Sequence, residues 1–146
     1  GLNTSMEWWT LAVISVESTA QVYYQALKDA TKCSLLKQIC TDILIDEAPH
    51  IQFQKERMEV IVNAKPYWQK VLTNKFYKIF FYATALLVWF AHKDVFKAGG
   101  VSFIKYLYKM DNKYRKTLGK LLFSSTEQHR QFKPSITLPK KFNYVN

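Results

Sequence analysis

The first thirty residues carry apolar side chains at helical spacing. The apolar positions recur every three or four residues, at Trp9, Val13, Val16, Ala20, Tyr24 and Leu27. Asn3, Thr4 and Ser5, which precede this series, are residue types that cap helix N-termini. The pattern predicts a helix over 5–30 whose apolar stripe faces the core.

A second helical pattern follows after a short polar interval. Ser34 is predicted to be its N-cap, and the helix is expected to extend toward residue 63. One face of it carries Leu36, Ile39, Ile43, Glu47, His50, Phe53 and Arg57. Since only a short turn separates the two helices, they are predicted to be antiparallel neighbours.

The second half of the chain predicts two more helices and a tail. Pro66 suits the first turn of a helix over 66–92, in which 79–91 is apolar all round. Thirteen such residues fall short of the roughly 20 that cross a bilayer. Ala98-Gly99-Gly100 breaks the pattern before a fourth helix over 101–123, and an extended tail is expected from Ser124 onward.

Composition agrees with an all-α fold. The 146 residues are 49% apolar, which excludes a disordered chain, and with only 4 Gly and 4 Pro a loop-rich sandwich is disfavoured. Cys33 and Cys40 would lie two turns apart on one helix, too far to form a disulfide. Free thiols suit a reducing compartment, so we expect a cytoplasmic protein.

Charge divides the chain into unlike parts. Residues 1–64 hold 5 basic and 8 acidic side chains, whereas 65–146 hold 16 basic and 3 acidic ones, within a net charge of +10. We therefore expect a helical hairpin over 1–64, a basic aromatic helical segment over 65–124 and the tail over 125–146. An anionic partner, a membrane surface or nucleic acid, is a candidate for the basic part.

Metal-ligating residue types occupy positions where core residues are expected. Glu17 lies within the predicted stripe of the first helix, and Glu47-Ala48-Pro49-His50 places a carboxylate and an imidazole one turn apart on the second. Burying an unpaired carboxylate is expensive, and a bound cation is one of the few arrangements that reverses the cost. Glu17, Glu47 and His50 are thus candidate metal ligands. The alternatives are a hydrogen-bonded core histidine and an ion pair from Glu17 to a basic residue.

Three segments together resemble the second helix pair of bacterial ferritin-like domain proteins, which are di-iron carboxylate helical bundles. They are 17–31, beginning Glu-Ser-Thr-Ala-Gln-Val-Tyr-Tyr, 35–40, and 46–54, Asp-Glu-Ala-Pro-His-Ile-Gln-Phe-Gln. The resemblance implies a ferritin-like hairpin in which Glu17, Glu47 and His50 bind iron or manganese. It covers less than half of the chain.

The ligand set amounts to half of such a site, because a complete one takes two lone Glu and two Glu-x-x-His units. Three explanations stay open: a preceding helix pair completes the bundle, two copies combine as a homodimer, or the metal chemistry has been lost. Pro49 removes a helical hydrogen bond at a cost of about 3 kcal/mol unless the helix kinks. A kink there would turn His50 away from Glu47.

The basic aromatic segment supports a second, non-catalytic function. The fourth predicted helix places Lys105, Lys109, Lys113, Arg115, Lys116 and Lys120 beside Phe103, Tyr106, Tyr108 and Tyr114. Such a helix suits an anionic membrane interface, and aromatic residues between lysines also suit single-stranded nucleic acid. We favour the membrane, since the apolar helix beside it needs cover that nucleic acid would not provide.

Overall fold

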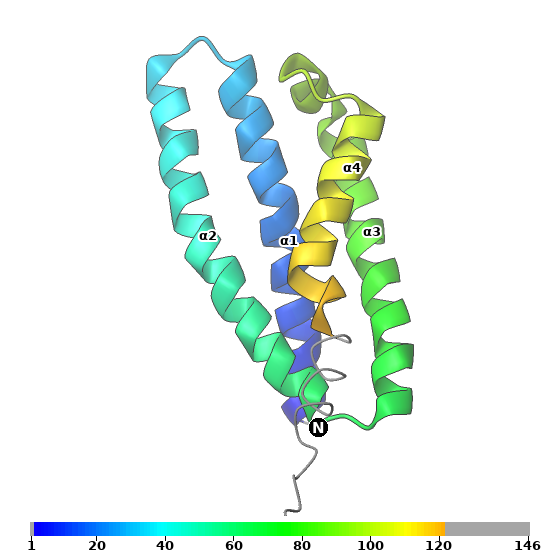
Figure 1. Ribbon diagram of the computed structural model, residues 1–146. Coiled ribbons are helices and arrows are strands. Elements are labelled where there is room, and N and C mark those ends of the chain that lie inside the picture. The colour runs from blue at the N-terminus through cyan, green and yellow to red at the C-terminus, as the bar shows by residue number, and fades with distance from the viewer. Residues whose placement is uncertain (1, 122–146) are drawn as a thin grey trace, which may run out of the picture.

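A computed structural model describes residues 2–121, and within them the chain is all-α, as predicted (Figure 1). Its helices are α1 (Leu2–Ala30), α2 (Ser34–Asn63), α3 (Tyr67–Ala98) and α4 (Phe103–Tyr114), followed by the π-helical turn η1 (Arg115–Gly119). The tail expected over 125–146 lies outside the described residues.

Helix α1 is the centre of the assembly. It packs against α2 on one side and α3 on the other, and α4 also contacts it (Figure 1). The core is built where these helices meet, from side chains such as Leu11, Met58, Phe81 and Tyr106, all with no exposed surface. Each fully buried apolar side chain of this size stabilises the fold by about 1.5–3 kcal/mol.

The predicted apolar stripe of α1 is not the face that packs in the core. Trp9 and Val16 are 66% and 57% exposed, so the prediction that they face inward was wrong. The buried positions are instead Glu7, Thr10, Leu11, Ile14, Ser15, Ser18, Thr19, Val22 and Ala26. Small hydroxyl residues can face the core here because most of them donate to backbone carbonyls of their own helix, as Ser15 Oγ does to the Leu11 oxygen at 2.8 Å.

Most predicted helix boundaries are confirmed to within a few residues. Cys33, not Ser34, is the N-cap of α2, and Pro66 precedes α3 in an extended conformation instead of occupying its first turn. The predicted end of the third helix, residue 92, coincides with a local break, since His92 has φ −129° and ψ 20° and the chain becomes helical again to Ala98. The fourth helix changes to a π-helical turn at Arg115.

Gly99 and Gly100 turn the chain from α3 into α4. Gly100 has a φ of 75°, which side chains rarely adopt, and a Cβ on Gly99 would lie 2.3 Å from the backbone oxygen of Ala26. The pair therefore provides both the turn and the close approach of this corner to α1. Ser102 then caps α4, accepting a hydrogen bond from the Lys105 backbone N–H at 3.3 Å.

Helix α3 is longer and more exposed than the sequence suggested. Judged only on length and composition, it is the one helix among the described residues that could cross a membrane. Only 22% of its most apolar window is buried within the protein. Its exposed apolar side chains recur at helical spacing, at Trp68, Leu72, Phe76, Ile79, Leu86, Leu87 and Phe90. The apolar stretch predicted over 79–91 was thus too short, because exposed apolar side chains begin well before residue 79.

Candidate metal centre

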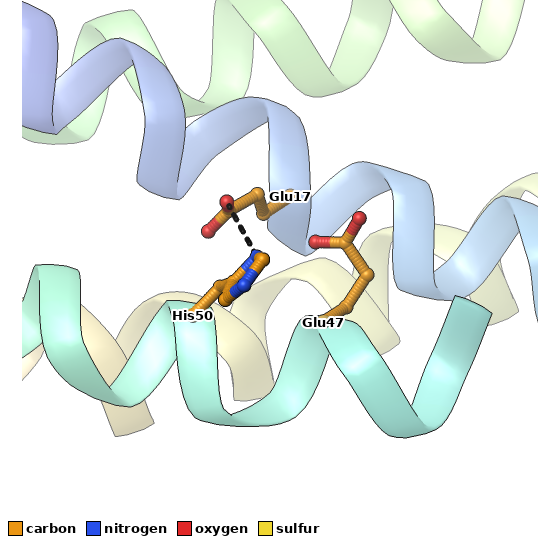
Figure 2. Close-up of side chains that lie close together, drawn as sticks. All are labelled: Glu17, Glu47 and His50. Carbon is orange, nitrogen blue, oxygen red and sulfur yellow. Dashed lines mark ion pairs between the residues drawn. The ribbon is translucent and has the colours of Figure 1, made fainter. Parts of the chain in front are cut away.

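The three predicted ligands lie together where α1 meets α2. Glu17 extends from α1 toward α2, and Glu47 and His50 extend from successive turns of α2 toward α1 (Figure 2). One ligand atom from each lies within 4.8 Å of the others, and His50 Nδ1 is 4.0 Å from Glu17 Oε1. The structure therefore brings together all three residues that the sequence singled out.

Local sequence accounts for this convergence. The turn at 31–33 reverses the chain between two long helices, so that positions equally distant from it face each other. Glu47 and His50 are three residues apart and share a face of α2. Helix α2 continues through Pro49 as one element, and His50 lies on the same side of it as Glu47. Pro49 therefore does not turn His50 away from Glu47.

The carboxylates are more buried than ordinary surface acids. The Glu17 side chain is 17% exposed, while His50 is 66% exposed. The Oε2 atoms of Glu17 and Glu47 are buried without a hydrogen-bond partner. Buried polar atoms are usually paired, because leaving one unpaired costs about 1–3 kcal/mol. Two unpartnered carboxylate oxygens in one place point to a missing positive charge or donor.

Electrostatics lead to the same conclusion. Burial raises the pKa of the Glu17 carboxyl above its ordinary 4.5, the nearby Glu47 raises it further, and His50 partly offsets both effects. Two carboxylates that repel each other in a partly desolvated position are a costly arrangement for the protein alone. A cation between them would remove the repulsion and occupy the unpaired oxygens.

The donor set fits a first-row transition metal. Two carboxylates and one imidazole suit iron or manganese, and with metal–ligand distances of about 2.0–2.2 Å neighbouring ligand atoms would be about 3 Å apart. The separations here are somewhat larger, so small side-chain rotations would close the set around one ion. Three ligands leave further coordination positions open, and the exposed imidazole places this opening at the surface.

A complete two-metal site would need a second set of ligands. Among residues 2–121, Glu17, Glu47 and His50 are the one group of three or more acidic, histidine or cysteine side chains close enough to share an ion. His92 belongs to no such group, and its ring lies 4.9 Å from that of Tyr23. His129 lies outside the described residues. The described part of the chain therefore offers one group of three candidate ligands.

Apolar side chains lie exposed beside the half-site. Phe53 follows His50 by one helical turn, and Val16 precedes Glu17 directly; both are more than half exposed. Arg57 lies over the Phe53 ring at 5.7 Å. Exposed apolar side chains therefore lie next to the candidate ligands on both helices.

Sequence reasoning missed a further buried carboxylate, that of Glu7. Glu7, at the opposite end of α1 from the 31–33 turn, accepts hydrogen bonds from Lys65 Nζ at 2.7 Å and from the Tyr77 hydroxyl. The burial and the hydrogen bond to Glu7 raise the Tyr77 pKa, so the phenol remains a neutral donor. These contacts join α1 to the start of α3 and explain Glu7 without a metal. Lys65 and Tyr77 are 58 and 70 positions away from Glu7, and no spacing pattern in the sequence links residues so far apart.

Comparison with protein-family models, with curated proteins and with solved structures found no match to this chain. The ferritin-like resemblance therefore depends on the sequence segments that carry it.

Proposed function

We propose that this chain is a ferritin-like metal-binding protein in which Glu17, Glu47 and His50 form half of a di-iron or di-manganese site. The observation that carries the proposal is the pair of buried, unpartnered carboxylate oxygens within reach of the His50 imidazole. A cation would satisfy both oxygens at once. Iron bound there would supply oxidative chemistry.

Each residue has a definite part in this proposal. Glu17 and Glu47 would supply the negative charge that holds the ion, and their positions on different helices would let them bind or bridge two neighbouring ions. His50 would donate through a neutral ring nitrogen. The surrounding helices keep the carboxylates partly dehydrated, which strengthens their attraction for a cation.

The missing ligands would come from an equivalent helix pair, either in a second copy or in another segment. A two-fold axis through the open face of α1 and α2 would bring two half-sites together, giving four carboxylates and two imidazoles. Val16 and Phe53 would then be covered at the same time.

Metal analysis of the purified protein tests the proposal. After anaerobic reconstitution with Fe(II) or Mn(II) and desalting, elemental analysis is expected to find up to one ion per chain, and Glu17→Ala with His50→Ala should lose it. The matched control is Glu59→Ala with His92→Ala, which removes a carboxylate and an imidazole elsewhere. Equal metal content in both double variants would refute the proposal. Light scattering with and without metal tells a dimer from a monomer.

The exposed apolar face of α3 favours a second candidate, a non-catalytic module that binds a membrane surface. The face runs from Trp68 to Phe90, about 33 Å at 1.5 Å per residue, and Lys75 and Lys93 are exposed on the same helix. An apolar helical face of this size needs a lipid or protein partner. The lysines at 109 and 113 of α4, at 116 of η1 and at 120 line a cleft next to α2, and Lys116 and Lys120 are also exposed to solvent.

Vesicle co-sedimentation tests this candidate separately from metal binding. Ile79→Asp with Leu87→Asp should abolish binding to anionic vesicles and leave the metal content unchanged. A matched control, Ile45→Asp with Val60→Asp, changes two exposed apolar residues of α2. Equal binding by the wild type and both variants would exclude α3 as a membrane-binding surface.

A further inference from the structure

A cleft of about 730 Å³ lies between α2 and the α4–η1 segment, with α1 at its base. Five lysines line it, one from α2 and four from the α4–η1 end of the described chain: Lys55, Lys109, Lys113, Lys116 and Lys120. None of its lining residues is acidic. Its volume falls within the range of about 300–1,000 Å³ that is typical of small-molecule sites.

The helical register of α4 and η1 concentrates this charge. Lys109, Lys113, Lys116 and Lys120 follow at intervals of four, three and four residues, which places their side chains on one face. Like charges at this spacing repel one another. Lys113 is the most affected, since burial lowers the pKa of its ammonium group and Lys116 and Lys109 lower it further. The protein alone therefore holds a positive cluster without an acidic partner along one side of an open cleft.

The base of the cleft adds hydrogen-bonding groups and an apolar surface. Ser18 of α1 is fully buried, lines the cleft, and its hydroxyl has no hydrogen-bond partner. Gln21, one turn further along, accepts a hydrogen bond from Lys113 Nζ. Val22, Leu44 and Ile51 supply the apolar part of the lining. The cleft thus combines a cationic side, an unused buried hydroxyl and an apolar wall.

We propose that this cleft binds a phosphate monoester, with its phosphate among the lysines and the Ser18 hydroxyl and its apolar part against Val22, Leu44 and Ile51. A phosphate monoester carries a charge of about −1.5 to −2 at neutral pH and offers three acceptor oxygens. Lysine binds such groups as a point charge, and several lysines together can neutralise one. The lone hydroxyl of Ser18 would donate to a phosphate oxygen.

This site is separate from the metal centre. Ala48 and Ile51 line the cleft, and each directly follows a candidate metal ligand in the sequence, so the two sites use different sides of α2. Ligand binding in the cleft does not require the metal ligands. Experiments with EDTA present therefore test the cleft whether or not the metal proposal holds.

Titration calorimetry with two probes tests the inference at fixed ionic strength, with EDTA present. Dihexanoyl phosphatidate carries the phosphate on an apolar group, and glycerol 3-phosphate carries it on a soluble one. Saturable binding with about tenfold preference for the phosphatidate identifies a lipid-like ester, and equal binding identifies a soluble one. If neither probe binds saturably up to millimolar concentration, the inference is wrong.

Variants locate the binding. Lys109→Gln with Lys113→Gln should weaken binding at least tenfold, and Ser18→Ala should weaken it by a smaller factor. The matched control, Lys75→Gln with Lys93→Gln, removes the same charge from exposed positions of α3. Circular dichroism verifies that each variant folds. If the control pair weakens binding as much as the cleft pair, general charge attraction explains the result and the cleft is not the site.

Discussion

His50 Nδ1 lies 4.0 Å from Glu17 Oε1 across the contact between α1 and α2, and Glu47 lies one turn from His50. The imidazole lowers the pKa of Glu17, but burial and Glu47 together raise it. We therefore expect the cluster to be costly without a cation and stabilising with one. This opposition leads to the first prediction.

Glu17→Gln should stabilise the metal-free protein and abolish its stabilisation by metal. Because the folded-state pKa of Glu17 is raised, the folded state binds more protons than the unfolded state between the two pKa values. The contribution of Glu17 to stability is thus full below the ordinary value of 4.5 and is lost as pH rises through the folded-state pKa. Thermal unfolding with EDTA at pH 5–8 should show the wild type losing stability relative to Glu17→Gln as pH rises.

At pH 7, bound metal should make the wild type more stable than Glu17→Gln. A ligand at a hundred times its dissociation constant adds about 2.7 kcal/mol of stability, which raises Tm by roughly 5–10 °C in a chain of this size. Mn(II) should raise the wild-type Tm in this way and leave that of Glu17→Gln unchanged. Glu59→Gln on α2 is the control and should respond like the wild type. A Tm that Mn(II) does not move in the wild type contradicts the metal proposal.

The clustering of Glu17, Glu47 and His50 and the helices were predictable from sequence because both depend on short-range spacing. Glu47 and His50 share a face through a three-residue interval, and the brief turn at 31–33 folds α1 onto α2. Glycines at 99 and 100 end α3 through their backbone geometry. In each case the residues that predict the structural feature lie within a few positions of it in the sequence.

The buried face of α1 and the lysine cleft were not predictable in the same way. The face that carries Ser15 and Ser18 looks polar in the sequence, yet both residues are buried, and the Ser15 hydroxyl is satisfied within its own helix. The cleft depends on the distance between α2 and α4, which are far apart in sequence. The spacing of Lys109 and Lys113 shows a common face, but not that α2 stands opposite it.

Lys65→Met should destabilise the fold by about 2 kcal/mol, since it leaves the largely buried Glu7 carboxylate without its cation. The Tyr77 hydroxyl would remain as a donor, which moderates the loss. Urea denaturation measures the change. Adding Glu7→Gln should recover part of the stability, because the unpaired charge is then gone. If the double variant is as unstable as the sum of the two single variants, the pair does not interact as described.

Three glycine substitutions separate steric from conformational effects. Gly99→Ala would place its Cβ 2.3 Å from the Ala26 oxygen and 2.7 Å from its Cα, so we expect a loss above about 3 kcal/mol. Gly100→Ala has open space but a φ of 75°, and should cost about 1–2 kcal/mol. Gly119→Ala meets only ordinary contacts from 3.5 Å and should change stability by less than about 1 kcal/mol. Urea midpoints in a different order would contradict the close contact between this corner and α1.

Lys113→Gln should make the ligand-free protein more stable at pH 7, although it weakens phosphate binding. Burial and its lysine neighbours lower the Lys113 pKa in the folded state, so the unfolded state binds more protons between that pKa and the ordinary 10.5. The penalty from Lys113 is full below the folded-state pKa, falls as pH rises from that pKa toward 10.5, and is gone only above 10.5. The stability advantage of Lys113→Gln over the wild type should therefore be largest near neutrality and shrink in the alkaline range. Thermal unfolding of both proteins from pH 7 to pH 11 measures this, with Lys78→Gln, at an exposed position of α3, as the matched control. A variant that is less stable than the wild type at pH 7 would mean that the hydrogen bond from Lys113 to Gln21 outweighs the repulsion. The positive cluster would then be a structural feature of the cleft, without the strain that an anionic ligand relieves.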